Sequence, residues 1–148
     1  MRSQSTSAAP VICNEIIAAV LSHEGDLALL RRSALVTGDV GSWNCVTGFL
    51  DSGNEPLSQA LQEIEEEAGI PHSDLQLLEN KILHLEDAHG QIWRVHAFHF
   101  SCQTRRLTLN WENDDSAWLR PDALHEMTIV PWFVDVLEAC NLAPIRKA

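Results

Sequence analysis

Residues 48–70 read GFLDSGNEPLSQALQEIEEEAGI, and this stretch decides the fold. It predicts a helix over residues 55–68, because Pro56 suits the first helical position and Gly69 suits the position just past the end. Its apolar residues recur at helical spacing within an arc of about 100°: Leu57, Ala60, Leu61, Ile64 and Ala68. We expect that arc to pack on the core of the protein.

Four carboxylates crowd into EIEEE at the end of this helix. With an advance of about 100° per residue, Glu63, Glu66 and Glu67 share one face beside the apolar arc, and Glu65 falls on the other side. Like charges three and four residues apart destabilise a helix, and residues 57–70 contain no lysine or arginine to offset them. A divalent cation is the natural counter-charge, because Mg²⁺ binds carboxylate oxygens together with water and phosphate. The alternative is a solvated acidic face without a ligand.

Composition limits the class of partner. The chain has 148 residues, 45% of them hydrophobic, which suits one domain with a sizeable core. Its formal net charge of −11 would repel a nucleic-acid polymer, and the sequence shows no basic patch. No stretch approaches the roughly 20 apolar residues of a membrane helix, so no membrane partner is expected. A small anionic substrate is compatible with this charge where a divalent cation lies between it and the protein.

The ends of the chain and the cysteines suggest one simple domain. Residues 1–11 lack the apolar core of a secretion signal and predict a flexible N-terminal tail. Residues 12–148 contain no internal repeat or linker and predict a single domain. The four cysteines are far apart and form no CxxC pair: Cys13, Cys45, Cys102 and Cys140. Buried reduced thiols in a cytoplasmic protein are therefore the prediction.

The rest of the chain predicts mainly strands. Residues 16–21 and 27–30 flank one turn, and residues 77–86 and 92–101 flank another, so each pair predicts a hairpin. Shorter segments are one or two strands over 43–50, a strand over 106–110, a polar loop over 111–116, a helical turn from Pro121 and a closing helix over 131–141. This pattern is typical of an α+β fold with a mixed, largely antiparallel sheet packed between helices.

The opening stretch also resembles the Nudix box, the signature of the Nudix hydrolases. That pattern is G-x5-E-x7-R-E-U-x-E-E-x-G-U, where U is a bulky aliphatic residue. Seven of its nine fixed positions agree without a gap, which is far more specific than a lone glycine motif: Gly48, Glu63, Ile64, Glu66, Glu67, Gly69 and Ile70. The resemblance covers most of residues 12–142 and implies a Nudix-like α/β/α sandwich.

The resemblance implies hydrolysis of a pyrophosphate bond in a nucleoside diphosphate-linked substrate: a nucleoside triphosphate, a nucleotide sugar or a dinucleoside polyphosphate. It implies Mg²⁺ or Mn²⁺ as the cofactor, which lowers the pKa of bound water, screens phosphate charge and orients the substrate. Glu63, Glu66 and Glu67 would supply the metal ligands, and the backbone carbonyl of Thr47 would add one. Gly48 would let the chain turn tightly there. Homodimers are common in the family, so a homodimer is among the expected states.

The family does not fix which carboxylate acts as the general base. Catalysis would rest on Glu63, Glu66 and Glu112, and the base would be Glu63 in some members or a late-loop glutamate, here Glu112, in others. Asp114 and Asp115 share that late loop. The alternative is an ordinary acidic turn at Glu112.

Three further residues are candidates for contact with substrate. Arg32 ends a predicted strand where members often place an arginine that contacts phosphate, and Arg31 is its alternate. The alternative for both is a surface charge at a strand end. Trp43 would stack on a nucleobase or, as the alternative, fill the core.

Two positions depart from the box, because Asn54 replaces its first glutamate and Gln62 replaces its arginine. In the family, that arginine is understood to orient the catalytic glutamates. A charged pair has here become two amides, and we hypothesise that Asn54 and Gln62 hydrogen-bond each other. The departures also support an alternative function, a Nudix-fold nucleotide-binding or regulatory module with little or no hydrolysis.

Overall fold

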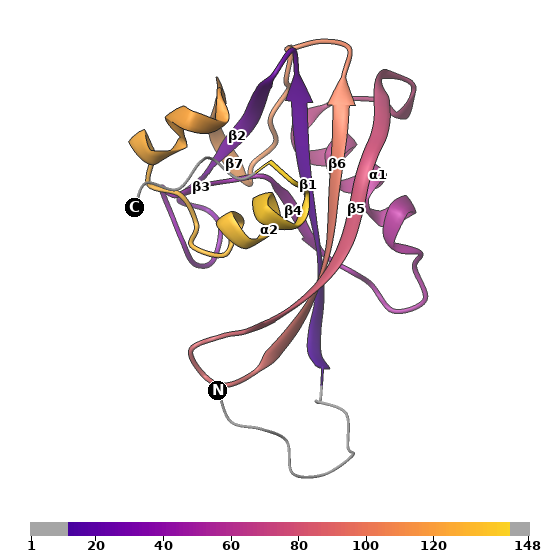
Figure 1. The fold of residues 1–148 in the computed structure, drawn as a ribbon, viewed down its shortest axis with the longest axis vertical. Helices are drawn as coiled ribbons and strands as arrows, with labels where there is room; N and C mark the ends of the chain where they lie inside the picture. Colours follow the sequence, from indigo (N-terminus) through magenta and orange to yellow (C-terminus); the bar gives the residue numbers. More distant parts are fainter. Residues whose placement is uncertain (1–11, 143–148) are drawn as a thin grey trace.

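Strand β1 (Ile12–His23) runs through the middle of a seven-stranded sheet in the computed structural model, which describes residues 12–142 (Figure 1). Five strands follow the order β3-β2-β1-β6-β5, while β4 pairs with β1 and β7 pairs with β2. The β1–β6 pair is parallel and every other pair is antiparallel. The remaining strands are β2 (Asp26–Arg32), β3 (Trp43–Asn44), β4 (Val46–Phe49), β5 (Leu75–Glu86), β6 (Ile92–Cys102) and β7 (Asn113–Leu119).

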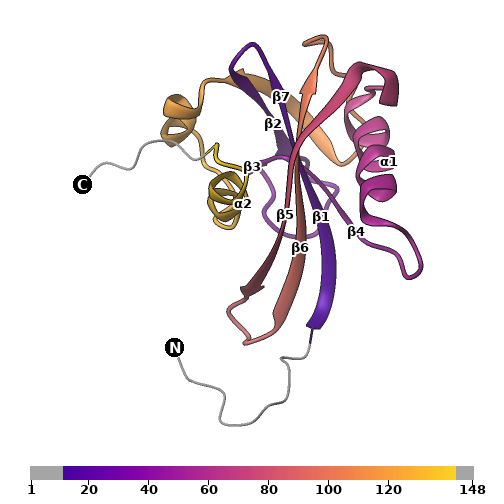
Figure 2. The same ribbon diagram turned by 45° about the vertical axis from the view of Figure 1, so that its right-hand side comes forward.

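Helices cover both faces of this sheet. Figure 2 shows α1 (Pro56–Ala68) on one side and α2 (Phe133–Ala139) on the other. Two short 3-10 helices, η1 (His72–Asp74) and η2 (Pro121–Glu126), complete the described chain. The predicted α+β class, with a mixed and largely antiparallel sheet between helices, is confirmed. The predicted tail over residues 1–11 and the last residues of the predicted domain, 143–148, lie outside the described residues.

Helix α1 begins and ends where its sequence predicts. Glu55 caps the start, since its carboxylate accepts a hydrogen bond from the backbone N–H of Ser58 at 3.1 Å, and Pro56 follows. Gly69 ends the helix in the left-handed conformation, with φ 72°, and donates its N–H to the carbonyl of Glu65. Local chemistry therefore fixes both ends of the helix that carries the acidic face.

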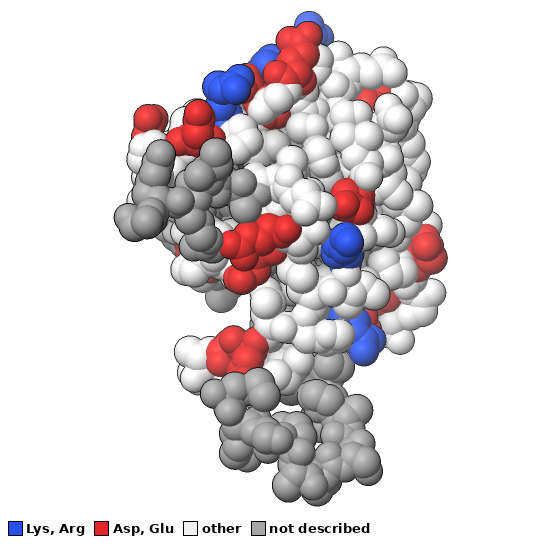
Figure 3. Space-filling view, viewed as in Figure 1, with Lys and Arg blue, Asp and Glu red and all other residues white. Residues whose placement is uncertain are grey.

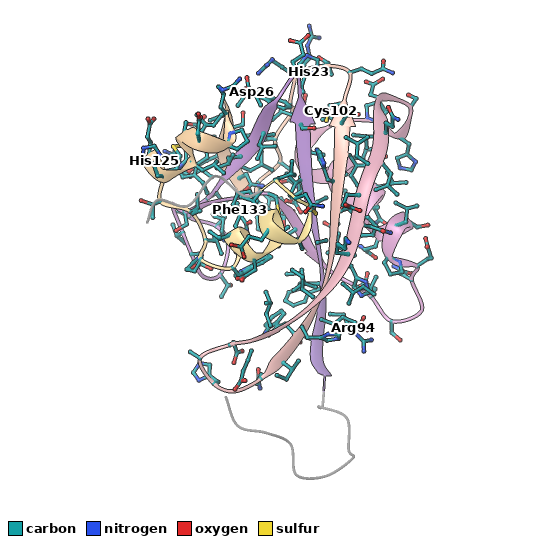
Figure 4. The ribbon with its side chains drawn as sticks, in the orientation of Figure 1. His23, Asp26, Arg94, Cys102, His125 and Phe133 are labelled. Carbon is teal, nitrogen blue, oxygen red and sulfur yellow. The ribbon has the colours of Figure 1, made fainter. Side chains whose placement is uncertain are left out.

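Alternation along β1 divides the core into two layers. Ile17, Ala19 and Leu21 pack toward α1, whereas Ala18 and Val20 pack toward α2. The closing helix buries four side chains at or next to α2 in the second layer: Phe133, which is labelled in Figure 4, Val136, Leu137 and Cys140. Period-two alternation thus gives a sheet with two apolar faces, each covered by one helix.

The predicted strand over residues 106–110 is wrong. This segment has no strand partner, although Leu107 and Leu109 pack against the α1-side core and Thr108 donates its backbone N–H to the carbonyl of Ala68 at 2.8 Å. The seventh strand is β7, which begins at Asn113 inside the predicted polar loop and pairs with β2. The alternating apolar residues of 106–110 serve packing on the core and not strand pairing. Residues 113–119 form a strand because they pair with the distant β2.

The cysteines and the surface fit the predictions where the structure describes them. Cys45, Cys102 and Cys140 are free and buried, while the side chain of Cys13 lies outside the described residues. On the face in Figure 3, the described Lys and Arg side chains form no continuous basic surface. No helix within residues 12–142 is long and apolar enough to cross a membrane.

Candidate active site

The acidic face of α1 runs from solvent into the protein. Glu66 is exposed, Glu63 is half-buried, and Glu67 is buried, with 3% of its surface exposed to solvent. Glu65 is exposed on the other side of the helix, as predicted. Burial of Glu67 without a cation beside it requires an explanation, because a buried carboxylate is stable only when it is paired or neutral.

Glu67 is an incompletely satisfied acid. Its Oε1 accepts from Nδ2 of Asn113 at 3.4 Å, while Oε2 is buried and has no hydrogen-bond partner among the described residues. Burial, with the neighbouring charges of Glu112 and Glu63 as smaller causes, raises the pKa of Glu67 to about 9. Without a cation, this side chain therefore holds a proton at neutral pH.

Glu63 lies directly on the backbone of β4. A Cβ added to Gly48 would come within 2.6 Å of both carboxylate oxygens of Glu63, so only glycine leaves room for that carboxylate. Burial also raises the pKa of Glu63, and a hydrogen bond from Gln59 partly opposes this rise. The predicted tight turn at Gly48 is wrong, because Gly48 lies inside β4 without a positive φ. Its role is close approach of the α1 carboxylate to the sheet.

The predicted amide pair between Asn54 and Gln62 is also wrong, because each amide has a different partner. Asn54 donates from Nδ2 to Oε1 of Gln59 at 2.6 Å, and Gln59 donates from Nε2 to Oε2 of Glu63 at 2.9 Å. Gln62 instead donates to Glu66 at 3.0 Å. Residues four apart on a helix lie on one face, so Gln59 reaches Glu63 and Gln62 reaches Glu66. Gln59 is 3% exposed and was missed by the sequence analysis, although its spacing from Glu63 is a readable signal.

The loop after β6 brings one further carboxylate to α1. Glu112 lies close enough for its charge to raise the pKa values of both Glu63 and Glu67, and it accepts a hydrogen bond from Asn110 at 3.1 Å. Asp114 instead pairs with Arg31, and Asp115 accepts from the backbone N–H of Ser116 at 2.8 Å. Of the three late-loop acids, Glu112 is therefore the one placed at the site.

The remaining candidates separate into two groups. Thr47 lies at the site, where its backbone partly opposes the rise in the pKa of Glu67. Arg32 also lies nearby, lining a cavity, although its guanidinium already donates to the carbonyls of Gly38 and Thr37 at 2.9 and 3.1 Å.

Arg31 and Trp43 lie elsewhere. Arg31 pairs with Asp114 at 2.7 Å and stacks over Trp43 at 5.8 Å from the ring centre. Trp43 packs against the α2-side core and lines neither cavity described below, which favours the alternative of a core residue.

Two cavities meet at β4. The first, of about 440 Å³, lies on the α2 side of the sheet, and the second, of about 570 Å³, opens between α1 and the loop that carries Glu112. Gly48, Phe49 and Glu112 line both. Glu63 and Glu66 line the second cavity.

The first cavity is also lined by side chains that the sequence did not single out, among them Asn44, Trp93 and Trp132. A substrate that spans β4 could therefore contact both cavities and the carboxylates between them.

The donors at this site suit a hard divalent cation. No group of three His, Cys, Asp or Glu side chains within residues 12–142 is already arranged around a common point. However, the buried Oε2 of Glu67 lacks a partner, and Glu63, Glu66 and Glu112 add further carboxylates from the adjoining surfaces. Carboxylate oxygens without nitrogen or sulfur donors are the ligands that Mg²⁺ and Mn²⁺ prefer.

The family model described as NUDIX domain matches residues 14–140. The chain belongs to the Nudix family. This assignment confirms the resemblance carried by residues 48–70, and it supports a pyrophosphohydrolase. A comparison with curated proteins finds no significant match.

Solved structures share the Nudix fold with this chain. The Ap4A hydrolase of C. elegans, in a binary complex, superposes with a TM-score of 0.70 at 18% identity and covers 85% of this chain and 93% of its own. The MutT protein of Methanosarcina mazei Go1 gives 0.70 at 19% identity, covering 86% and 92%. The NUDIX domain of Shewanella oneidensis NrtR, complexed with ADP ribose, gives 0.68 at 18% identity, covering 90% and 88%.

Proposed function

We propose that this Nudix protein hydrolyses a pyrophosphate bond in a nucleoside diphosphate-linked substrate, with Mg²⁺ or Mn²⁺ as its cofactor. The observation that carries the proposal is Glu67, a buried carboxylate with an unpartnered oxygen beside two further carboxylates. A structural helix would gain nothing from that arrangement, because it leaves a polar atom buried and unpaired. A divalent cation would remove both the unpaired atom and the repulsion.

Three carboxylates of α1 would bind the cation, and nearby residues position them. Glu63, Glu66 and Glu67 would hold the cation, with the backbone carbonyl of Thr47 as a further ligand. When bound, the cation supplies charge neutralisation on the phosphates and a more acidic water. Gly48 leaves space for the Glu63 carboxylate, and Gln59 fixes the orientation of that carboxylate by hydrogen bonding.

Glu112 is the general base in this proposal. It lines both cavities at β4, where a spanning pyrophosphate would lie, and it comes from a loop rather than from the helix that holds the cation. A carboxylate whose oxygens are bound to a cation is a poor proton acceptor, so Glu63 is better suited to binding. Arg32 lies in the first cavity and would contact phosphate if the loop over residues 37–38 released it.

A second candidate function is a nucleotide-binding or regulatory module with little hydrolysis. The neutral relay from Asn54 through Gln59 to Glu63 favours it, because an amide orients a carboxylate less strongly than a guanidinium does. The proposals of a cytoplasmic location and of a homodimer rest on cysteine usage and on family resemblance, respectively.

The test is a substrate panel assayed with Mg²⁺, with Mn²⁺ and with EDTA. The panel contains nucleoside triphosphates, nucleotide sugars with ADP-ribose, and dinucleoside polyphosphates. We expect metal-dependent release of a nucleoside monophosphate or diphosphate by the wild type, lost in Glu66→Gln and Glu67→Gln and retained in Glu65→Gln. No turnover of any substrate would favour the binding module. Turnover that both site substitutions leave intact would overturn the assignment of these carboxylates.

A further inference from the structure

Strand β5 forms a free edge of the sheet. It pairs with β6 on one side, and no strand within residues 12–142 pairs with its other side (Figure 1). The strand is twelve residues long, and three of its apolar residues have 40%, 50% and 59% of their surface exposed, respectively: Leu77, Leu78 and Ile82. An edge strand of this length with exposed apolar side chains is a template for pairing with another chain.

The sequence of β5 is complementary to itself when a second copy runs antiparallel to it. Residues 75–85 read LQLLENKILHL. A two-fold axis at Asn80 places apolar residues opposite apolar ones, polar opposite polar, and acid opposite base. The facing pairs, each formed twice, are Glu79 with Lys81, Leu78 with Ile82, Leu77 with Leu83, Gln76 with His84, and Leu75 with Leu85.

The central pairs lie in regular strand. The pairing of β5 with β6 shifts register at Leu78, whereas residues 79–86 follow β6 without interruption. Glu79 and Lys81 are two residues apart and point to the same face of the sheet, so Glu79 of one copy can meet Lys81 of the other. Lysine on an edge strand normally opposes pairing with a second strand. In this register the second copy supplies the opposite charge.

We propose that two copies of this chain pair antiparallel along β5, with the two-fold axis at Asn80, and so form one continuous sheet. An axis at Glu79 or at Lys81 is disfavoured, because it would place two like charges directly opposite each other. Pairing would also remove the exposed apolar side chains of the edge from water. The inference supplies an interface for the homodimer proposed above, and it holds whether or not the chain hydrolyses a pyrophosphate.

Reversing the two charges tests this register. Lys81→Glu places two glutamates opposite each other, and Glu79→Lys places two lysines opposite each other. Each variant alone should dimerise about tenfold more weakly than the wild type in sedimentation equilibrium, because two attractive pairs become repulsive. An equimolar mixture of the two variants should recover dimers, because every charge then faces its opposite. Arg120→Glu, the same change of net charge at an exposed position after β7, should dimerise as the wild type does.

A cysteine on the axis tests the register independently. Facing residues of antiparallel strands have Cα atoms about 4.5 to 5.5 Å apart, which a disulfide can span. Asn80→Cys should therefore give a covalent dimer under mild oxidation, seen on a non-reducing gel. Gln76→Cys should not, because the two copies of residue 76 would lie about 27 Å apart, eight residues out of register. The wild type controls for the native thiols, of which three are buried: Cys45, Cys102 and Cys140.

The results separate this inference from the proposed function. A monomeric wild type at every soluble concentration, a mixture of the charge variants that stays monomeric, or equal crosslinking of Gln76→Cys and Asn80→Cys would each overturn the β5 interface. Dimers that both charge variants form as tightly as the wild type would overturn it too. Dimers of the expected register in a protein that hydrolyses no member of the substrate panel would instead refute the enzymatic proposal and leave the interface standing.

Discussion

Replacing Glu67 with glutamine should stabilise the metal-free protein while abolishing its response to metal. The side chain is 3% exposed, and its pKa is raised to about 9 in the folded protein, first by burial. The amide of Glu67→Gln has nearly the same shape as the protonated acid. Its amide oxygen can accept from Asn113 as the carboxyl group does, and its amide nitrogen places no charge in the buried site.

The magnitude follows from the difference in pKa between the two states. The ordinary pKa is 4.5 and the folded value is about 9, so between these values the unfolded chain is ionised while the folded protein still holds the proton. The contribution of Glu67 to stability is therefore greatest below pH 4.5 and falls as pH rises toward 9, by about 1.4 kcal/mol per pH unit. At pH 7 the accumulated cost is at most about 3.5 kcal/mol. The glutamine variant does not titrate and escapes this loss.

Urea unfolding in EDTA at pH 6 and at pH 8, followed by tryptophan fluorescence, measures the effect. The free energy of unfolding of Glu67→Gln should exceed that of the wild type, with a larger excess at pH 8. Added Mg²⁺ should raise the stability of the wild type, because a ligand bound only to the folded state stabilises it, and should leave the variant unchanged. A variant that is less stable at both pH values, or that responds to Mg²⁺ as the wild type does, would refute the reasoning.

Three further substitutions probe the parts around this carboxylate. Gln59→Leu should lower kcat/KM and Mn²⁺ affinity about tenfold, the usual effect of removing a partner that orients a metal ligand. Gln62→Leu, which removes an exposed amide, should lower Mn²⁺ affinity less in a parallel titration. Gly48→Ala should lower Mn²⁺ affinity about tenfold or more by displacing Glu63, measurable by calorimetry. Glu112→Gln should lower kcat about a hundredfold or more while Mn²⁺ affinity persists; a parallel loss of affinity would make Glu112 a ligand.

Local features of the sequence predicted the central helix and its acidic face. Pro56 and Gly69 act within a few residues of the helix ends, and the helical period places Glu63, Glu66 and Glu67 on one face, so these predictions need no tertiary information. The register of the Nudix box then identified the family. The degree of burial could not be predicted, because a helical wheel does not show that Glu67 lies beneath Asn113 and β4.

The error in the strands arose where distant segments decide the outcome, and the error at Asn54 arose from the conformation of a loop. Segment 106–110 has the alternation of a strand but finds no partner, while β7 forms from a polar sequence because β2 offers it a free edge. The partner of Asn54 depends on how the loop before α1 folds back onto Gln59. The pairing of β7 with β2 depends on residues far apart in the chain, whereas the bond from Asn54 joins residues five apart and depends on the conformation of the loop before α1.

Mn²⁺ binding measured by electron paramagnetic resonance tests the central claim most directly. At pH 8, the wild type should bind Mn²⁺ at a site from which added Mg²⁺ displaces it. Glu67→Gln should lose this site, and Glu65→Gln, which removes an equal charge from the other side of the same helix, should retain it. Equal losses of Mn²⁺ binding in both variants would mean that the acidic face attracts cations only diffusely. Unchanged binding in Glu67→Gln would contradict a cation site built around the buried carboxylate.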